Sequence, residues 1–311
     1  MKNLIFIFLI ILWACNKENE PNNDVETSHI SYFGFTLIVT YWDDPTDSNT
    51  KTNYLNEVSD FSNIADILIL GPSDNIIESL NQMNAVDVKS ILHLSDLFFE
   101  VTGTNSPSGL KHSLRLDFES RWNKFVQTNN LQDNKNLVQA FYIGEEPTWN
   151  GISFNELQMA SSLIKSSIPD IPILIIEAYP VIDQLEVPGS IDWVGFDHYA
   201  VKDPENNPQF LNEFHLLKSK LSNEQQKIVL VMDTHYIPSL HGTYGHIALE
   251  DMADVANSYY NLAKKEPKVI AILGYFWPSG FDNLEAIGAR NMPLFIKENY
   301  IRIGKEITLK K

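Results

Sequence analysis

The chain is poor in cysteine and in positive charge. Cys15 is its only cysteine, which excludes a disulfide scaffold, a cysteine-ligated zinc site and a cysteine-ligated metal cluster. Lys and Arg number 23 against 40 Asp and Glu, so the formal net charge is −17. A field of that sign repels phosphate backbones and disfavours anionic ligands, so we expect no nucleic-acid partner.

The apolar run at residues 4–12 is too short to span a membrane, since it is about half the roughly 20 residues that a spanning helix needs. With Lys2 before it, the run has the pattern of a signal-peptide core. The segment ends at residues 12–15 in a motif that resembles a bacterial lipobox, in which Cys15 is acylated and becomes the mature N-terminus. The alternative is an N-terminal strand of the core.

Residues 15–29 predict a polar tether, because they are acidic and polar without apolar periodicity. An acidic stretch directly after the lipid cysteine resembles the surface-export signal of Bacteroidetes lipoproteins. We therefore predict a signal peptide at 1–14, a lipid-anchored tether at 15–29 and a globular domain at 30–311. The resemblance implies that the lipid holds the protein at the bacterial outer membrane, on the cell surface or the periplasmic face. We also predict a monomer.

The remaining sequence alternates short apolar strands with amphipathic helices. The strand-like runs are almost continuously apolar, as expected when both faces of a parallel sheet are buried; they are 32–42, 65–70, 88–94, 137–143, 173–178, 193–199, 227–232 and 269–277. Apolar residues at helical spacing lie between them, at 75–83, 154–168, 249–263 and 293–303. Eight such repeats predict a single (β/α)8 barrel. A doubly wound sheet is disfavoured because no glycine-rich turn follows the first strand.

Carboxylates, histidines and aromatic residues gather where the predicted strands end, which is the catalytic end of such a barrel. They predict an acidic, aromatic pocket for a neutral sugar chain, with carboxylates binding hydroxyls and aromatic faces stacking on sugar rings. The predicted substrate-binding residues are Trp42, Asp43, His93, Tyr179, His198, Tyr199, His235, Tyr236, Tyr275 and Trp277.

Residues 141–147 resemble the strand-four signature of clan A glycoside hydrolase barrels, where an Asn-Glu-Pro run carries the acid/base glutamate. The resemblance assigns that role to Glu146. It also places Asp233 where strand seven carries the nucleophile, and Trp277 where strand eight supplies the floor of a sugar subsite. Residues 191–199 are similar to the strand-six stretch of these barrels.

The sequence departs from this pattern at two positions. Glu145 stands where the family has Asn, and Asp233 stands where it has Glu. Glu145, Glu177 and Asp197 are therefore rivals for the second catalytic carboxylate. Since Asp is one methylene shorter than Glu, the stereochemical outcome stays open. Glu145 and Glu146 are neighbours, so on a regular strand they face opposite ways; if both reach the pocket, repulsion raises the pKa of one.

The histidines match no familiar zinc motif, so we predict no metal and no cofactor. The leading interpretation is a lipid-anchored glycoside hydrolase that cleaves O-glycosidic bonds in a polysaccharide or oligosaccharide. One alternative is a catalytically inactive barrel lipoprotein that binds glycan. Another, motivated by the number of histidines, is a metal-dependent hydrolase or deacetylase.

Overall fold

The computed structural model describes residues 29–311. The predicted signal peptide, Cys15 and nearly all of the predicted tether lie outside the described residues. Within residues 29–311, every helix is too short or too polar to cross a bilayer.

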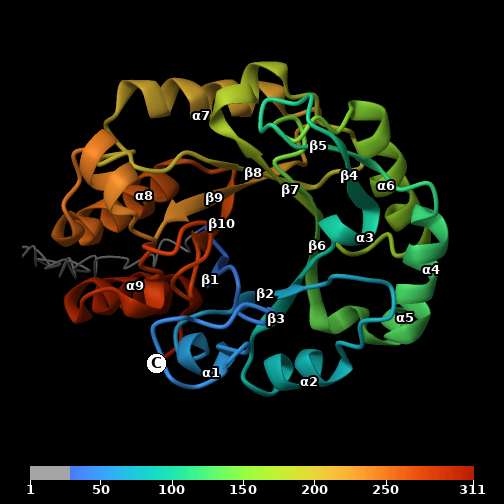
Figure 1. The fold of residues 1–311 in the computed structure, drawn as a ribbon, viewed down its shortest axis with the longest axis horizontal. Coiled ribbons are helices and arrows are strands. Elements are labelled where there is room, and N and C mark those ends of the chain that lie inside the picture. Colours follow the sequence, from blue (N-terminus) through green and yellow to red (C-terminus); the bar gives the residue numbers. More distant parts are fainter. Residues whose placement is uncertain (1–28) are drawn as a thin grey trace, which may run out of the picture.

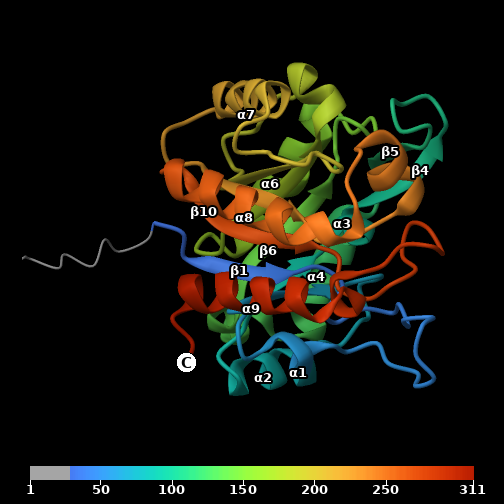
Figure 2. The same cartoon turned by 90° about the vertical axis from the view of Figure 1, so that its left-hand side faces the viewer.

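Eight strands of the described chain form one parallel sheet that curls into a barrel, in the order β1-β10-β9-β8-β7-β6-β3-β2. Helices surround this barrel in Figures 1 and 2, which confirms the predicted (β/α)8 fold. The barrel strands are β1 (Tyr32–Phe35), β2 (Ile64–Leu68), β3 (Lys89–His93), β6 (Val138–Glu145), β7 (Ile173–Ala178), β8 (Trp193–Asp197), β9 (Lys227–Asp233) and β10 (Val269–Tyr275).

The seam between β1 and β2 closes because a glycine lets the two strands approach. A Cβ atom at Gly34 would lie 2.0 Å from the carbonyl oxygen of Ile64, so a larger residue would push the strands apart. At the same seam, the backbone N–H of Asn63 donates to the carbonyl oxygen of Phe33 at 3.0 Å.

The helices pack their apolar stripes on the outside of the barrel. They are α1 (Leu55–Val58), α2 (Ile77–Ala85), α3 (Ser95–Phe98), α4 (Phe118–Thr128), α5 (Leu131–Asn134), α6 (Phe154–Ser167), α7 (Pro208–Lys220), α8 (Met252–Lys265) and α9 (Leu294–Thr308). A capping box opens α6: the Ser153 hydroxyl accepts from the backbone of Glu156, whose carboxylate accepts from the backbone of Ser153.

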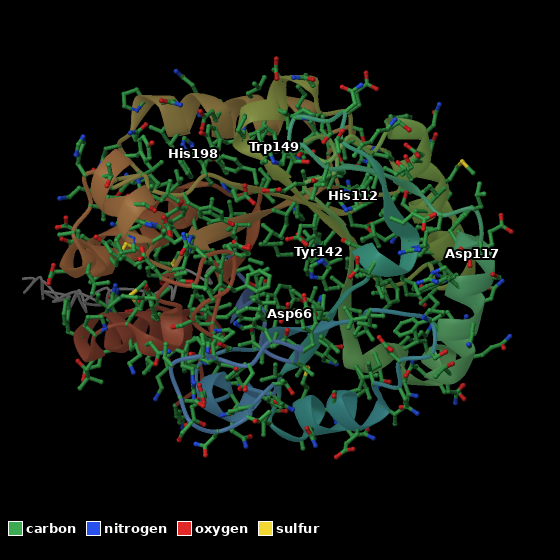
Figure 3. All side chains as sticks on the ribbon, in the orientation of Figure 1. Asp66, His112, Asp117, Tyr142, Trp149 and His198 are labelled. Carbon is green, nitrogen blue, oxygen red and sulfur yellow. The ribbon has the colours of Figure 1, made fainter. Side chains whose placement is uncertain are left out.

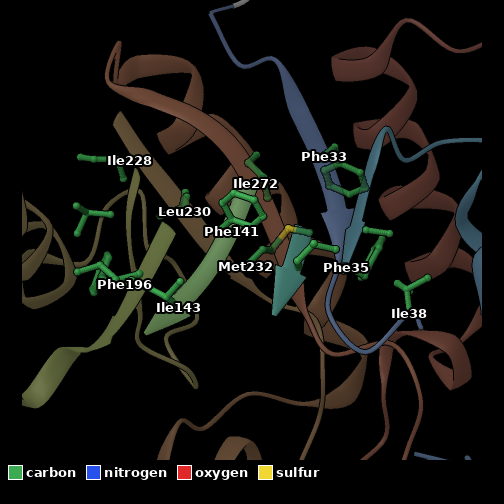
Figure 4. Packing of buried hydrophobic residues seen from close by; sticks show 14 of the residues in the cluster. Phe33, Phe35, Ile38, Phe141, Ile143, Phe196, Ile228, Leu230, Met232 and Ile272 are labelled. Carbon is green, nitrogen blue, oxygen red and sulfur yellow. The ribbon is translucent and has the colours of Figure 1, made fainter. Parts of the chain in front are cut away.

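Both faces of the strands are buried, which explains their continuous apolar runs. On β9, Ile228 and Leu230 face the helices in the layer that Figure 4 shows, whereas Val229 and Val231 fill the barrel interior. The alternation places consecutive side chains in different environments. A side chain at a strand end therefore reaches the barrel mouth only if this alternation turns it toward the barrel interior.

The first predicted run, 32–42, is strand only as far as Phe35. Leu37 has a positive φ of 59°, and the buried carboxylate of Asp66 accepts the backbone N–H groups of Leu37 at 3.0 Å and Ile38 at 2.8 Å. These bonds hold the chain in a turn that ends the regular strand, and beyond it only Val39 pairs again with β2, opposite Ile67. The prediction of a strand through residue 42 was wrong.

An antiparallel hairpin that the sequence analysis did not predict follows α3. It consists of β4 (Phe99–Gly103) and β5 (Lys111–Leu114), and it lies beside the barrel between α3 and α6 in Figure 1. Its strands are short and largely exposed, so their apolar pattern is weak.

Candidate active site

A cavity of about 340 Å³ opens at the C-terminal ends of the barrel strands. Six of the residues predicted for the site line it: His93, Glu145, Glu146, Asp197, Tyr199 and Tyr275. The other lining residues include Asp66 and Tyr142, which Figure 3 shows near the centre of the ring of strands. The described chain therefore has an acidic, aromatic pocket where the strand ends predicted one.

Glu145 and Glu146 both line the cavity, although neighbours on a regular strand would face opposite ways. The pairing of β6 with β7 shifts between Tyr142 and Gly144. Gly144 consequently faces the helix layer, where an added Cβ would meet the side chain of Leu157, and Glu145 turns inward. Glu146 then adopts a left-handed φ of 47°, which brings its side chain to the same cavity. Two local irregularities thus create the carboxyl pair.

Glu145 is the member of the pair that stays ionised. Burial opposes its charge, but the hydrogen bond and the positive charge of His93 outweigh burial and lower the pKa of Glu145. The His93 Nε2 atom lies 3.1 Å from the Glu145 Oε2 atom. The same contact raises the pKa of His93 against the opposing effect of its burial. The two residues form a carboxylate–imidazolium pair on one wall of the cavity.

Glu146 is the member that holds a proton. Burial, followed by the negative charges of Glu145, Glu177 and Asp282, raises the pKa of Glu146 to about 8. Its carboxyl group makes no hydrogen bond to any residue within 29–311, so the proton is free to go to a bound molecule. The backbone at this position is fixed, because the Glu146 N–H donates to the Ile176 carbonyl oxygen at 2.7 Å.

Asp197 faces the same cavity from the end of β8. Burial and the negative charges of Glu146, Glu177 and Glu145 raise its pKa well above the ordinary range. The Tyr199 hydroxyl lies 3.4 Å from the Asp197 Oδ2 atom. Asp197 is therefore a second carboxyl group of the cavity in which burial and neighbouring charges favour the protonated form.

Aromatic rings form the rest of the wall. Tyr199 and Tyr275 stack with ring centres 5.1 Å apart and planes at 13°, and the Tyr275 hydroxyl donates to Asp282 at 2.7 Å. Tyr142 packs against His93 at 4.3 Å. These faces suit the C–H surface of a sugar ring.

Two carboxylates that line the cavity, Asp66 and Asp282, lie away from the predicted strand ends, so the sequence analysis missed them. Burial raises the pKa of Asp66 to about 6 even though it accepts two backbone hydrogen bonds. An acidic residue inside the apolar run of β2 was a usable signal for Asp66. Asp282 carried no such signal, because it lies on the loop beyond β10 and reaches the cavity only through the fold.

Asp233 lies behind the cavity wall, which argues against the predicted role of nucleophile or base. Its carboxylate is fully buried, and its Oδ2 atom accepts the Ala200 backbone N–H at 2.8 Å and faces the His241 Nε2 atom at 3.0 Å. The His235 Nδ1 atom lies 3.3 Å from the Asp233 Oδ1 atom. Burial is the largest single effect and raises the pKa of Asp233, but the charges and hydrogen bonds of these partners together outweigh it and hold the pKa below its usual value.

Asp233, His235 and His241 are also the group of described residues best placed to hold a metal, with ligand atoms within 4.8 Å of one another. Their hydrogen bonds account for the grouping without one. The backbone N–H of Ile237 donates to His241 Nδ1 at 2.9 Å, which leaves the ring proton on Nε2 facing Asp233. His235 Nδ1 lies 3.1 Å from the Tyr275 carbonyl oxygen, and burial lowers the pKa of His235 to about 4.

Glu177, another rival carboxylate, supports the loop that follows Glu146. It is fully buried and accepts backbone N–H groups from Thr148 at 2.8 Å and Trp149 at 3.2 Å. Figure 3 labels Trp149 on this loop. Glu177 does not line the cavity, so it holds the loop and acts on Glu146 through its charge.

Both predicted tryptophans are structural. Trp277 is 5% exposed, packs on Phe35 at 4.9 Å and donates from Nε1 to Glu57 at 2.7 Å. Trp42 donates from Nε1 to the Ser279 carbonyl oxygen at 2.9 Å. Neither lines the cavity. The Trp277 side chain packs in the apolar layer outside the barrel, and Tyr275, two residues earlier, takes the wall position.

The remaining predicted binding residues also lie outside the cavity. Asp43 is exposed and accepts the backbone N–H of Lys51, and Tyr179 stacks on His198 at 3.7 Å. The hydroxyl of Tyr236 donates to the Ile247 carbonyl oxygen. These contacts tie the loops of the barrel end together.

The fold matches solved glycoside hydrolases. A glucosidase from Croceicoccus marinus superposes with a TM-score of 0.62 and 11% identity, over 91% of this chain and 67% of that chain. A GH113 β-mannanase from Alicyclobacillus acidocaldarius, solved with ManMIm, gives 0.52 and 10% over 93% and 99%. A psychrophilic family 10 endo-β-1,4-xylanase gives 0.52 and 13% over 90% and 96%. At these identities the likeness establishes the shared barrel fold.

No protein-family model matches the sequence, and no curated protein matches it significantly.

Proposed function

We propose that the protein is a glycoside hydrolase that cleaves O-glycosidic bonds in an oligosaccharide or polysaccharide. The observation that carries the proposal is the carboxyl pair at the end of β6, in which Glu146 is protonated and Glu145 is ionised within one cavity. Glycoside hydrolysis needs such a division, one carboxyl acting as acid and the other meeting the positive charge of the transition state. The three solved barrels compared above are a glucosidase, a xylanase and a mannanase, which supports the same chemistry.

In this proposal Glu146 protonates the oxygen of the departing sugar. Glu145, held ionised by His93, stabilises the positive charge that develops on the sugar ring or activates water. Asp197, whose pKa is raised well above the ordinary range, donates a hydrogen bond from its protonated form to a sugar hydroxyl. Tyr199 and Tyr275 bind a ring face. NMR of the first-formed anomer would distinguish whether Glu145 acts as nucleophile or as base.

Release of reducing ends from a panel of defined glycans tests this function. The panel contains β-1,4-linked manno-, xylo- and gluco-oligosaccharides and their polymers. We expect hydrolysis of at least one neutral member by the wild-type protein and not by Glu146→Gln.

A glycan-binding barrel without catalysis is the second candidate. It is favoured by the placement of Asp233, because β9 supplies no carboxylate to the cavity. Binding of a panel glycan without any turnover would establish this candidate and overturn the first.

The pKa of Glu146 predicts the alkaline limit of activity. Since the acid form is the active one, kcat/KM is expected to fall as pH rises through about 8, by about tenfold for each further pH unit. At acid pH, activity is expected to persist even when the pH falls below the ordinary pKa of a glutamate, because His93 keeps Glu145 ionised. Glu146→Gln should lack the alkaline limb. A wild-type profile that is flat from pH 6 to pH 10 would contradict the assignment.

We further propose that the protein is a bacterial lipoprotein acylated at Cys15 and exposed to the periplasm or the cell surface, on the sequence of residues 1–29. Cys15→Ala is expected to move the protein from the membrane fraction to the soluble fraction, since several acyl chains are needed to hold a protein stably on a bilayer. Ser31→Ala, a similarly small change at the start of the barrel, is the control. Membrane association that survives Cys15→Ala would refute the lipid anchor.

A further inference from the structure

We propose that a pocket on the other side of the Glu145–Glu146 pair binds the sugar unit that departs, so that the substrate is a neutral chain extending past the cleaved bond. The pocket has a volume of about 170 Å³ and is lined by Ser95, Asp96, Phe99, His112, Glu145, Glu146, Asn150 and Ile152. The inference deepens the proposed glycosidase function and rests on it.

Glu146 stands at the junction of two hollows. Ser95, Asp96, Glu145 and Glu146 line both the central cavity and this pocket, so the two spaces meet at the carboxyl pair. An acid that protonates a glycosidic oxygen must lie between the sugar ring that is attacked and the one that leaves. The central cavity therefore takes the attacked ring, and the smaller pocket takes its neighbour.

The outer wall of the pocket is the hairpin β4–β5, and this wall is firmly attached. The backbone N–H of His112 donates to the Asn150 carbonyl oxygen at 2.8 Å, and that of Ser108 donates to the Trp149 carbonyl oxygen at 3.0 Å. The hairpin is thereby bonded to the loop that directly follows Glu146. Figure 3 shows His112 on the side of the barrel mouth near this loop. A preformed wall keeps the cost of binding low.

The polar groups of the pocket suit sugar hydroxyls. His112 Nδ1 is 3.1 Å from the Leu110 carbonyl oxygen, and its Nε2 atom makes no hydrogen bond to the described residues. The Asp96 carboxylate likewise has no hydrogen-bond partner within residues 29–311. Asn150 uses its amide N–H on the Glu145 carbonyl oxygen at 2.9 Å, which leaves its side-chain oxygen as an acceptor. Phe99 supplies an apolar surface.

The charges of the pocket exclude acidic sugars. Asp96 and Glu145 are carboxylates facing the space, and His112 is the only basic residue among the lining residues. A uronic acid or a sulfated sugar in this position would place a further negative charge beside them. The substrate class is therefore a neutral oligosaccharide or polysaccharide.

His112→Ala tests the inference by its effect on two kinds of substrate. On the neutral oligosaccharide that the wild type cleaves fastest among manno-, xylo- and gluco-tetraoses, kcat/KM should fall about 10–100-fold, since a hydrogen bond in the departing-sugar pocket is lost. On the nitrophenyl glycoside of the same sugar, which places no sugar in the pocket, kcat/KM should stay within about threefold. His215→Ala is the control, because His215 is exposed on α7 and lines neither hollow.

If His112→Ala lowers kcat/KM equally on both substrates, or on neither, the pocket assignment is overturned. The proposed glycosidase function would still stand. Binding to Glu146→Gln gives a second readout that does not depend on turnover: adding His112→Ala should weaken binding of the tetraose and leave binding of the monosaccharide unchanged. Unchanged tetraose binding would also overturn the assignment. A wild-type protein that neither cleaves nor binds any neutral glycan of the panel would overturn the proposed function and this inference together.

Discussion

Glu146→Gln is expected to lower kcat on an unactivated glycan by about 10²–10⁴-fold, because the amide cannot donate the proton that the departing oxygen needs. The structure gives this residue the properties of a general acid: a pKa of about 8, a place in the cavity wall and no competing hydrogen bond within residues 29–311. The same substitution should cost far less on nitrophenyl glycosides, whose leaving group departs without protonation. Steady-state kinetics on both substrates measures the difference.

Two further variants make this result specific. Glu119→Gln, an identical change on the exposed face of α4, should leave both rates unchanged. Glu145→Gln should impair both substrates alike, because an ionised carboxylate is needed whatever group departs. If Glu145→Gln instead spares the nitrophenyl substrate and Glu146→Gln impairs both, the two roles are exchanged. If neither variant affects turnover, the catalytic role of the β6 end is refuted.

Asp233→Ala is expected to reduce the free energy of unfolding by about 2–6 kcal/mol, about 1–3 kcal/mol for each of the two hydrogen-bond donors that lose their acceptor. The variant leaves the buried His241 without its carboxylate partner and the half-buried Ala200 N–H without its acceptor. Urea denaturation followed by fluorescence measures the loss. The folded fraction should keep a kcat much closer to wild type than Glu146→Gln does.

The exposed Asp183 offers a matched control, since Asp183→Ala removes a carboxylate that makes no side-chain hydrogen bond within residues 29–311. Its effect on unfolding should lie within about 0.5 kcal/mol. An Asp233→Ala protein with wild-type stability and a kcat reduced as far as that of Glu146→Gln would show that Asp233 is catalytic after all. That outcome would restore the role that resemblance assigns to the end of strand seven.

The two predictions concern residues that looked equivalent in the sequence. Glu146 and Asp233 both end an apolar run, and both match positions of the same barrel family. Strand ends are predictable because apolar runs are local and because parallel strands of a barrel share one catalytic end. The two residues differ in their surroundings. Asp233 contacts His241, which lies eight residues further along the chain in a short helix at Pro238–Tyr244 that folds back over the strand end. A contact of this kind depends on the path of a loop, which periodicity does not describe.

The amino-acid sequence by itself determined the architecture: eight doubly buried strands, the capped helix α6, and an acidic, aromatic end of the barrel that includes His93 and Asp197. These follow from hydrophobic periodicity and strand polarity, which are properties of short segments. The tertiary structure alone decided which side chains face the cavity. The register shift before Gly144 and the left-handed Glu146 bring two neighbouring carboxyls together, because side-chain direction depends on pairing register and backbone angles. The tertiary structure alone also placed the hairpin β4–β5 beside these two carboxyl groups, since no sequence pattern links the hairpin to the loop that it contacts.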